Sequence, residues 1–217
     1  MLRVGLTGGI ATGKTTVAAM LGELGCHVLY ADQIARDLME PGAAAFANVV
    51  TEFGAGILDA DGRVDRPKLA AIVFSNSARI ARLNAIVHPR VLEALERALA
   101  AIERADPHGI AVIEAALLIE AEFHRHLDCL VVTWCTPEQQ IARLTGPQSD
   151  RKLTPEQARQ RIAAQMPLEQ KRRMADEEID CSGSLEHTRE QVRALLEKLT
   201  VMEAAVSRKR SEVDRHE

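Results

Sequence analysis

The chain has 217 residues, of which 47% are hydrophobic and 27% charged, and its formal net charge is -4. Its apolar share is large enough for a full core, and its length predicts one domain with an appended subdomain or two. The negative charge excludes an overall basic field, so we expect no nucleic-acid partner and a local site for any bound anion.

The four cysteines, Cys26, Cys129, Cys135 and Cys181, lie far apart and form no CxxC pair, which argues against a zinc site or a disulfide framework. The first residues reach glycine too soon for the apolar stretch of a signal peptide. The longest apolar runs fall short of the roughly 20 residues that cross a bilayer. We therefore expect a cytoplasmic protein that does not enter the membrane.

The first 42 residues predict a strand, a glycine loop, a helix and a second strand. An apolar run at 4–7 meets Gly8, and apolar residues then recur at helical spacing up to Gly25, which should cap that helix. A second strand follows at 26–30. Asp32 stands where an N-cap would, and the next helix should stop at Pro41–Gly42.

The middle of the chain predicts helices only. Short helices over 43–73 are interrupted by residues 59–62, which read as a tight turn. A strongly helical stretch covers 78–105, and Pro89 should break or kink it just after His88. We interpret residues 43–105 as a helical insertion into an α/β domain.

Alternating strands and helices are expected again from residue 110, with strands at 110–113, 127–134 and 178–180. Thr136 followed by Pro137 predicts a helix start, and a charged, arginine-rich segment over 146–176 is interpreted as a lid. A closing helix is expected over 185–202, with residues 207–217 polar and disordered. The nucleotide-binding core would comprise 1–42, 106–145 and 177–205, followed by a polar tail at 206–217.

Residues 8–15 match the phosphate-binding pattern GxxxxGK[ST] at every fixed position, between a predicted strand and a helix. The glycines turn backbone N–H groups toward the β-phosphate, Lys14 reaches the β- and γ-phosphates, and the hydroxyl of Thr15 ligates Mg²⁺. The alternative is a glycine-rich turn that binds nothing. The predicted ATP-binding residues are Gly9, Ile10, Ala11, Thr12, Gly13, Lys14, Thr15 and Thr16.

The loop alone does not separate kinases from GTPases or ATPases. The sequence lacks the Asn-Lys-x-Asp pattern with which a GTPase reads the base, and this argues against a GTPase. The strand ending at Glu114 only loosely resembles the corresponding strand of a motor ATPase. A small-molecule kinase needs a carboxylate base and arginines near the γ-phosphate. Asp32 could supply the base, with a plain N-cap as its alternative, and Arg143 and Arg151 could reach the phosphates.

Five separated segments in order resemble the dephospho-coenzyme A kinase family. They are Leu-Thr-Gly-Gly-Ile at 6–10, Ala-Asp-Gln-Ile-Ala-Arg at 31–36, Leu-Asn-Ala-Ile-Val-His-Pro at 83–89, Leu-Leu-Ile-Glu at 117–120, and 161–184 with its Ala-Gln-Met-Pro and Gly-Ser. The resemblance implies a three-layer α/β P-loop fold with a parallel five-stranded sheet, a helical acceptor-binding insertion and a lid. It implies phosphorylation of the ribose 3′-hydroxyl of dephospho-coenzyme A, the last step of coenzyme A synthesis.

The resemblance also implies roles for individual residues. Asp32 would be the base that activates the hydroxyl, and Lys14 and Arg143 would stabilise charge on the transferring phosphoryl group. His88, Leu118 and Glu120 would contact the acceptor, although a histidine before proline is more often a helix-end residue. The departures from the family pattern are Ala11 in place of glycine, Tyr30 in place of aspartate, Ala116 in place of proline and Cys181 in place of asparagine.

Two rival functions remain open from the sequence. A kinase of another small alcohol would lack the His-Pro helix, and a nucleotide-binding regulator would bind ATP without acceptor-dependent release of ADP. The sequence is compatible with a monomer or a small homo-oligomer, because no apolar stripe exceeds what the core requires.

Ala11 carries a Cβ, so it must take φ < 0 or accept strain.

Overall fold

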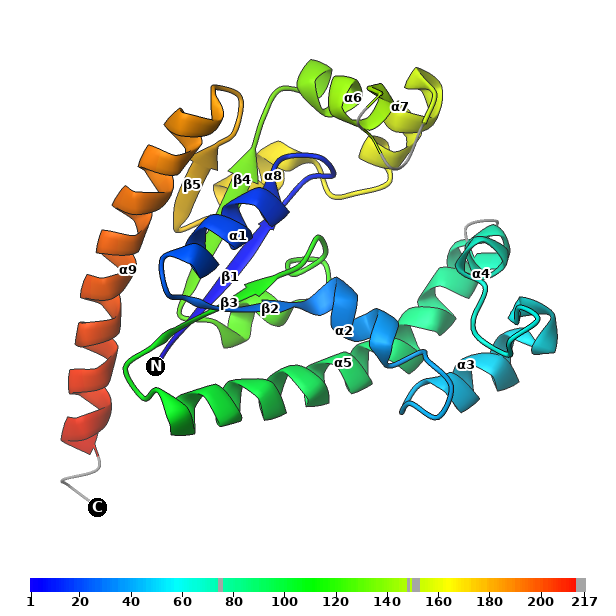
Figure 1. The fold of residues 1–217 in the computed structure, drawn as a ribbon, viewed down its shortest axis with the longest axis horizontal. Coiled ribbons are helices and arrows are strands. Elements are labelled where there is room, and N and C mark those ends of the chain that lie inside the picture. The colour runs from blue at the N-terminus through cyan, green and yellow to red at the C-terminus, as the bar shows by residue number, and fades with distance from the viewer. Residues whose placement is uncertain (74–75, 148, 150–152, 214–217) are drawn as a thin grey trace. The chain divides into compact units, whose positions relative to one another are not determined.

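The computed structural model of the chain describes residues 1–73, 76–147, 149 and 153–213. The chain divides into two compact units (Figure 1). The first unit comprises residues 1–29 and 102–217, and the second comprises residues 30–101. The second unit therefore begins earlier than the predicted insertion at 43–105 and takes in Asp32.

The first unit contains a parallel sheet whose strands are ordered β2-β3-β1-β4-β5. The strands are β1 (Leu2–Gly8), β2 (His27–Tyr30), β3 (Ile110–Glu114), β4 (Cys129–Trp134) and β5 (Glu177–Asp180). β1 is central and pairs in parallel with β3 on one side and β4 on the other. The connections after β1 place later strands on both of its sides. In sheets of this kind, ligands bind at the carboxyl end of the strand where the order reverses in this way.

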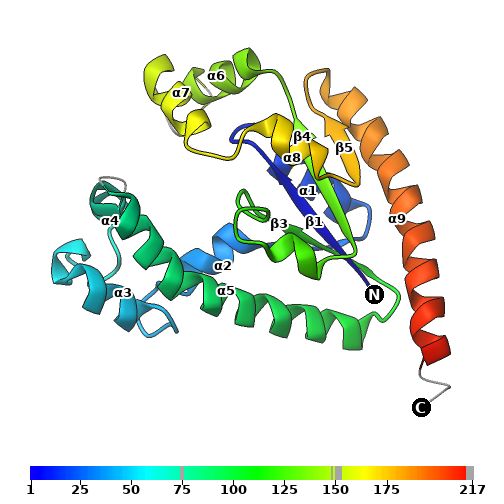
Figure 2. The ribbon, with the colours of Figure 1, turned by 180° about the vertical axis from the view of Figure 1, so that it is seen from behind.

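Helices cover both faces of the sheet, which gives the predicted three layers (Figures 1 and 2). α1 (Lys14–Glu23) and α9 (Leu185–Val213) contact each other and β1 and β3, whereas α8 (Leu168–Arg173) contacts β1 and β4. On the α8 side, Ile119, Leu130 and Val132 form a buried cluster against Met166 and Leu168. Strands covered in this way read as continuous apolar runs, as β3 and β4 do.

Several helix ends follow from local side-chain chemistry. α6 (Pro137–Thr145) begins with a capping box between Thr136 and Gln139, as the sequence predicted. The same arrangement, between Thr154 and Gln157, starts α7 (Pro155–Ala163). Gly25 lies just past α1 with φ of 97°, the left-handed conformation expected of a glycine that ends a helix.

The second unit contains α2 (Ala31–Asp37), α3 (Phe46–Phe53), η1 (Ala55–Ile57), α4 (Arg66–Val73) and most of α5 (Ser77–Ala105). It has its own apolar core, which packs together Ala45, Val49, Ile57, Leu69, Val73 and Val87. The predicted turn at 59–62 is present, because the carboxylate of Asp59 accepts from the N–H groups of Asp61 and Arg63. The unit therefore has the buried cluster expected of a compact body.

Pro89 does not end its helix, and the predicted break there is wrong. α5 runs on from Ser77 to Ala105 with Pro89 inside it. Pro89 and Ala85, whose carbonyl loses its helical donor, are both exposed, so water can satisfy that carbonyl. Burial of Val87, Leu95 and Leu99 keeps the helix intact on its other side.

Two further expectations about helix ends are corrected. Asp32 is not an N-cap: Tyr30 is, and Asp32 lies in the first turn of α2, which ends at Asp37 rather than at Pro41–Gly42. The polar stretch from Ser207 is helical to Val213, because α9 continues well beyond residue 202. Residues 214–217 lie outside the described part of the chain. Within the described part of the chain, no helix combines the length and the apolar content that a membrane span requires.

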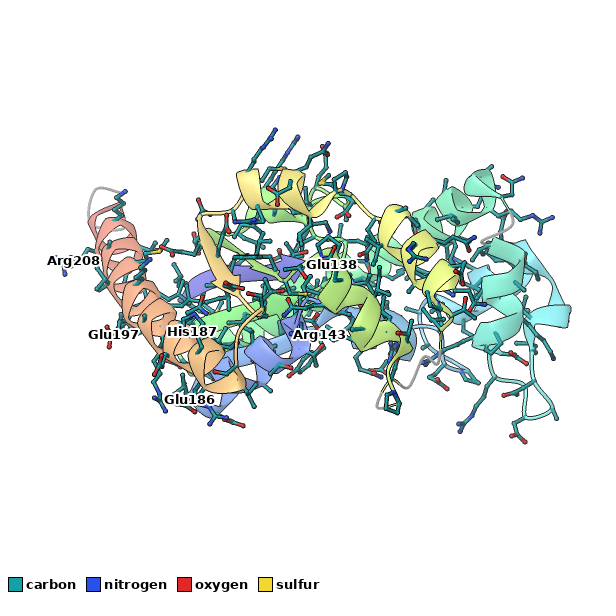
Figure 3. All side chains as sticks on the ribbon, turned by 90° about the horizontal axis from the view of Figure 1, so that it is seen from above. Glu138, Arg143, Glu186, His187, Glu197 and Arg208 are labelled. Atoms are coloured by element: carbon teal, nitrogen blue, oxygen red, sulfur yellow. The ribbon has the colours of Figure 1, made fainter. Side chains whose placement is uncertain are left out.

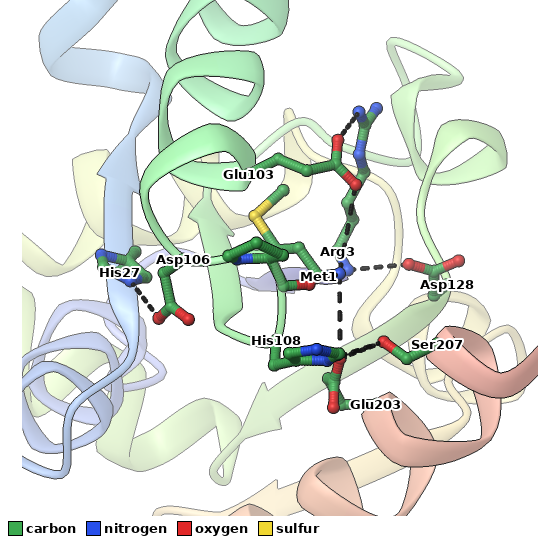
Figure 4. A network of polar contacts seen from close by, with 10 residues as sticks. Met1, Arg3, His27, Glu103, Asp106, His108, Asp128, Glu203 and Ser207 are labelled. Carbon is green, nitrogen blue, oxygen red and sulfur yellow. Dashed lines mark hydrogen bonds and ion pairs between the residues drawn. The ribbon is translucent and has the colours of Figure 1, made fainter. Parts of the chain in front are cut away.

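Polar contacts at the amino ends of the strands hold the first unit together (Figure 4). Nε2 of His27, at the start of β2, lies 2.9 Å from the carboxylate of Asp106, in the loop that precedes β3. The backbone N–H of Arg3 donates to Asp128 at 2.8 Å. These contacts lie at the edge of the sheet away from the phosphate loop, so they serve the scaffold rather than the site.

Candidate active site

The phosphate loop follows β1 directly and reaches α1 at Lys14. Nζ of Lys14 donates to the carbonyl of Gly9 at 2.9 Å, and the side chain is 9% exposed. Gly13 has φ of 98°, and a Cβ there would lie 3.0 Å from Sγ of Cys181. Glycine is therefore required at position 13 by both backbone conformation and space.

Ala11 occupies the left-handed region, with φ of 59°. Of the two possibilities that the sequence left open, the structure shows the strained one, which costs an alanine about 1–2 kcal/mol relative to its ordinary conformations. The carbonyl of Ala11 accepts from Nη1 of Arg143 at 3.1 Å. The strained residue, Ala11, is thus held by a hydrogen bond from the side chain of Arg143 on α6.

Two threonine hydroxyls fix the interior of the loop to the sheet. Oγ1 of Thr12 donates to the carbonyl of Gly9 at 2.9 Å and lies 2.8 Å from Oγ1 of Thr133 on β4. Both threonines are fully buried. Because an unsatisfied buried hydroxyl is costly, this pair holds the loop against β4.

Arg143 comes from α6 (Figure 3), and Nη1 of its side chain lies 3.1 Å from the carbonyl of Ala11 in the loop. Its Nη2 donates to the carbonyl of Cys181 at 2.6 Å, in addition to its bond with Ala11. The residue as a whole is exposed, and both Nη atoms of its guanidinium are held by backbone carbonyls. The structure brings together two of the predicted charge-stabilising residues, Lys14 and Arg143, around one loop.

Cys135 and Cys181 follow β4 and β5 and lie under the loop. The N–H of Cys181 donates to the carbonyl of Trp134 at 2.8 Å, which extends the pairing of those strands. Burial raises the pKa of the Cys181 thiol to about 11 and raises that of Cys135 as well, although Arg143 opposes the shift in both. Both therefore stay neutral thiols at physiological pH and act as small apolar side chains.

Glu120, predicted to contact the acceptor, is engaged within the first unit. Its carboxylate lies 2.8 Å from Nζ of Lys171, which is fully buried, and accepts from the N–H of Met166 at 3.3 Å. Lys171 also donates to the carbonyl of Ala116 at 2.7 Å. Leu118 is only 3% exposed, while its neighbour Leu117 is 40% exposed. An acceptor contact by Leu118 or Glu120 stays a prediction.

Asp32 and His88 belong to the second unit. Asp32 is exposed in the first turn of α2, two residues beyond the end of β2. His88 is partly buried in α5, and this burial lowers the pKa of its imidazole below the usual value. Thr15 and Thr16 are exposed in the first turn of α1, where a hydroxyl is available to a ligand.

The segment interpreted as a lid contains α7 and α8. Ala158, Leu153 and Ile162 pack with Leu144 of α6 and with Ile10 of the phosphate loop. Arg151 lies outside the described residues. This apolar cluster joins the segment directly to the loop.

Four residues that hold the loop and its neighbours were missed in the sequence: Gln140, Gln165, Thr133 and Lys171. Gln140 donates to the carbonyl of Ile10 at 2.6 Å, and Gln165 accepts from the N–H of Ile10 at 2.7 Å. No periodicity marks such residues. The signal available was that Gln165 and Lys171 both fall within the last segment of the family resemblance.

Comparisons with known proteins extend through both units. Residues 2–187 match the family model described as dephospho-CoA kinase. The chain is 42% identical over 195 residues to the dephospho-CoA kinase of Carboxydothermus hydrogenoformans, covering 90% of this chain and 93% of that protein. The crystal structure of TT1252 from Thermus thermophilus is 31% identical, with a TM-score of 0.75 over 91% of this chain and 97% of that chain. The dephospho-CoA kinase from Campylobacter jejuni, 23% identical, has the same fold, with a TM-score of 0.67 over 91% of this chain and 96% of that chain.

Proposed function

Because the chain belongs to the dephospho-CoA kinase family, we propose that it transfers the γ-phosphate of ATP to the ribose 3′-hydroxyl of dephospho-CoA, with Asp32 as base. The observation that carries the proposal is the convergence of Lys14 and Arg143 on the phosphate loop. Two cations at one loop suit a reaction in which negative charge spreads over the transferring phosphoryl group.

ATP is the donor, and its phosphates lie against residues 9–16. Lys14 contacts the β- and γ-phosphates, and Arg143 stabilises charge on the group in transfer. Thr15, exposed at the start of α1, would hold Mg²⁺, which neutralises phosphate charge when bound. An exposed hydroxyl in that turn fits a hard, oxygen-preferring cation.

Asp32 accepts the proton of the 3′-hydroxyl as the oxygen attacks phosphorus. The observation that supports this role is that Asp32 is exposed in the first turn of α2. Asp32 is thus available to a ligand.

The second unit, which contains His88, binds the acceptor, and Leu118 and Glu120 of the first unit are further acceptor contacts. The 146–176 segment acts as a lid. Exclusion of water by the lid would prevent hydrolysis of ATP in place of transfer. We further propose a cytoplasmic protein, a monomer or a small homo-oligomer, that binds neither nucleic acid nor membrane.

The test is release of ADP by the purified protein with Mg-ATP, measured with and without dephospho-CoA. We expect acceptor-dependent turnover that falls by about 10²–10⁴ in Asp32→Asn, the usual contribution of a general base. Asp37→Asn is the matched control, because Asp37 is another exposed aspartate of α2.

Each outcome has a distinct meaning. Equal loss in both variants would mean that α2 is disturbed and that Asp32 is not the base. ADP release at the same rate without acceptor would replace the kinase with an ATPase. ATP binding without any ADP release would indicate a nucleotide-binding regulator.

A further inference from the structure

The peptide units at the tip of the phosphate loop are each held by a side chain from outside the loop. The N–H of Ile10 is bound by Gln165, the carbonyl of Ile10 by Gln140, and the carbonyl of Ala11 by Arg143. Because a backbone N–H can only donate and a carbonyl can only accept, these partners fix which amide atom each glutamine presents. Three consecutive peptide units are thereby oriented.

The first of these peptide units also carries the acceptor for the loop lysine. In a trans peptide, the N–H of Ile10 and the carbonyl of Gly9 point in opposite directions. Gln165 binds the N–H side, so the carbonyl side is turned toward Lys14, whose Nζ lies 2.9 Å from it. The contact made by Gln165 thus orients, together with the hydroxyl of Thr12, the carbonyl that accepts from the Lys14 ammonium.

The second peptide unit of the loop, between Ile10 and Ala11, is held by Gln140. This side chain is 3% exposed, and a Cβ on Gly9 would lie 2.7 Å from its Nε2. Glycine at position 9 is therefore what lets the amide reach the Ile10 carbonyl. Gln140 lies on α6, three residues before Arg143, so one helix carries both groups.

Gln165 lies between α7 and α8, in the proposed lid. The next residue, Met166, donates its N–H to Glu120, and the side chain of Ile10 packs against Ala158 and Ile162. Ile10 is therefore bound to the lid segment through its side chain and its N–H. The conformation of the loop is tied to the placement of that segment.

We propose that Gln165 and Gln140 are positioning residues for phosphoryl transfer, which orient the peptide units of Ile10 and thereby the Lys14 ammonium, with Gln165 linking that orientation to the lid. The inference rests on the proposed kinase function. Neither glutamine is assigned contact with the reacting atoms.

The experiment compares substitutions that keep or remove the required atom. Gln165→Met keeps length without an acceptor, whereas Gln165→Glu keeps the acceptor. We expect kcat to fall about 10- to 100-fold in Gln165→Met, as for a small misplacement of catalytic groups, while KM for dephospho-CoA changes less than about threefold. Gln165→Glu should retain kcat within about threefold, although its charge weakens ATP binding.

Gln140 donates where Gln165 accepts, so substitution by glutamate should not preserve its function. Both Gln140→Met and Gln140→Glu lose the bond, so both should lower kcat at least 10-fold, about one lost hydrogen bond's effect on an equilibrium constant. Gln160→Met, an exposed position on α7, is the control and should match the wild type. Thermal unfolding confirms that each variant is folded.

The proposal is overturned if Gln165→Met keeps the wild-type kcat, or if Gln165→Glu is as impaired as Gln165→Met. A wild type without acceptor-dependent turnover would instead count against the kinase function. ATP affinity measured by calorimetry then still decides the inference: weaker binding by Gln165→Met and Gln140→Met than by Gln160→Met supports it, and equal binding by all three overturns it.

Discussion

The loop that binds phosphate and the unit proposed to bind the acceptor are held in different ways. Around the loop, Gly9, Ile10 and Ala11 have backbone atoms bound by side chains from α1, α6 and the segment before α8. In the second unit, Asp32 is exposed and does not cap its helix. The proposed ATP site thus relies on a loop that is already fixed by other parts of the protein. The proposed chemistry at the acceptor hydroxyl relies instead on an exposed side chain.

After Asp32→Asn, the largest effect should come from Lys14, whose ammonium serves both the phosphates and the carbonyl of Gly9. Lys14→Met removes both the phosphate contact and the bond to Gly9, and kcat should fall about 10²–10³, as for loss of one charge-stabilising donor. Steady-state ADP release measures it. Unlike Asp32→Asn, this variant should also bind ATP more weakly in calorimetry, and equal ATP affinity for the two variants would contradict the comparison.

Lys171 tests how far the first unit depends on internal polar contacts. Lys171→Met leaves Glu120 and the carbonyl of Ala116 without their buried donor, and we expect a loss of about 1–3 kcal/mol in the free energy of unfolding. Urea denaturation measures this loss. Lys198→Met removes an exposed lysine that pairs with the partly buried Glu177, and it should cost less than about 1 kcal/mol. Similar losses for both variants would show that burial of the lysine does not matter here.

Ala11 offers a smaller, stabilising change. Glycine relieves about 1–2 kcal/mol of left-handed strain but adds about 0.5–1 kcal/mol of backbone entropy to the unfolded state. Ala11→Gly should therefore raise the free energy of unfolding by about 0.5–1 kcal/mol in urea denaturation. Glu122→Gly, at φ of 56° outside the loop, is the control: it should be stabilised similarly with unchanged activity. A destabilised Ala11→Gly would contradict the strain.

His88 concerns the second unit and should give the smallest effect. Burial lowers the pKa of its imidazole below 6.5, so the unfolded chain takes up a proton first as the pH falls. The stabilising contribution is present above pH 6.5 and is lost as the pH drops through the lowered pKa. Urea unfolding at pH 7.5 and 5.0 should show a shallower decline in His88→Gln than in the wild type. Parallel declines would contradict the shift.

Much of the candidate site was predictable from the sequence because its signals are local. The phosphate loop, its lysine and the Thr136 cap each rest on residues within eight positions of one another, and the structure confirms the strand, loop and helix at 2–23. Arg143 was found from its place on the helix leading into the lid segment. Loop and cap chemistry of this kind needs no distant partner.

The sequence alone determined the strands, the phosphate loop and the family, since apolar runs, glycine spacing and caps act over a few residues. Only the tertiary structure decided how the loop is held, because Gln140 and Gln165 lie 130 and 155 positions from Ile10 and carry no periodic signal. It also decided that Pro89 stays within α5, where burial on one side of the helix and exposure on the other outweigh a missing hydrogen bond. Such outcomes depend on which groups packing makes available, and no short stretch of sequence contains that information.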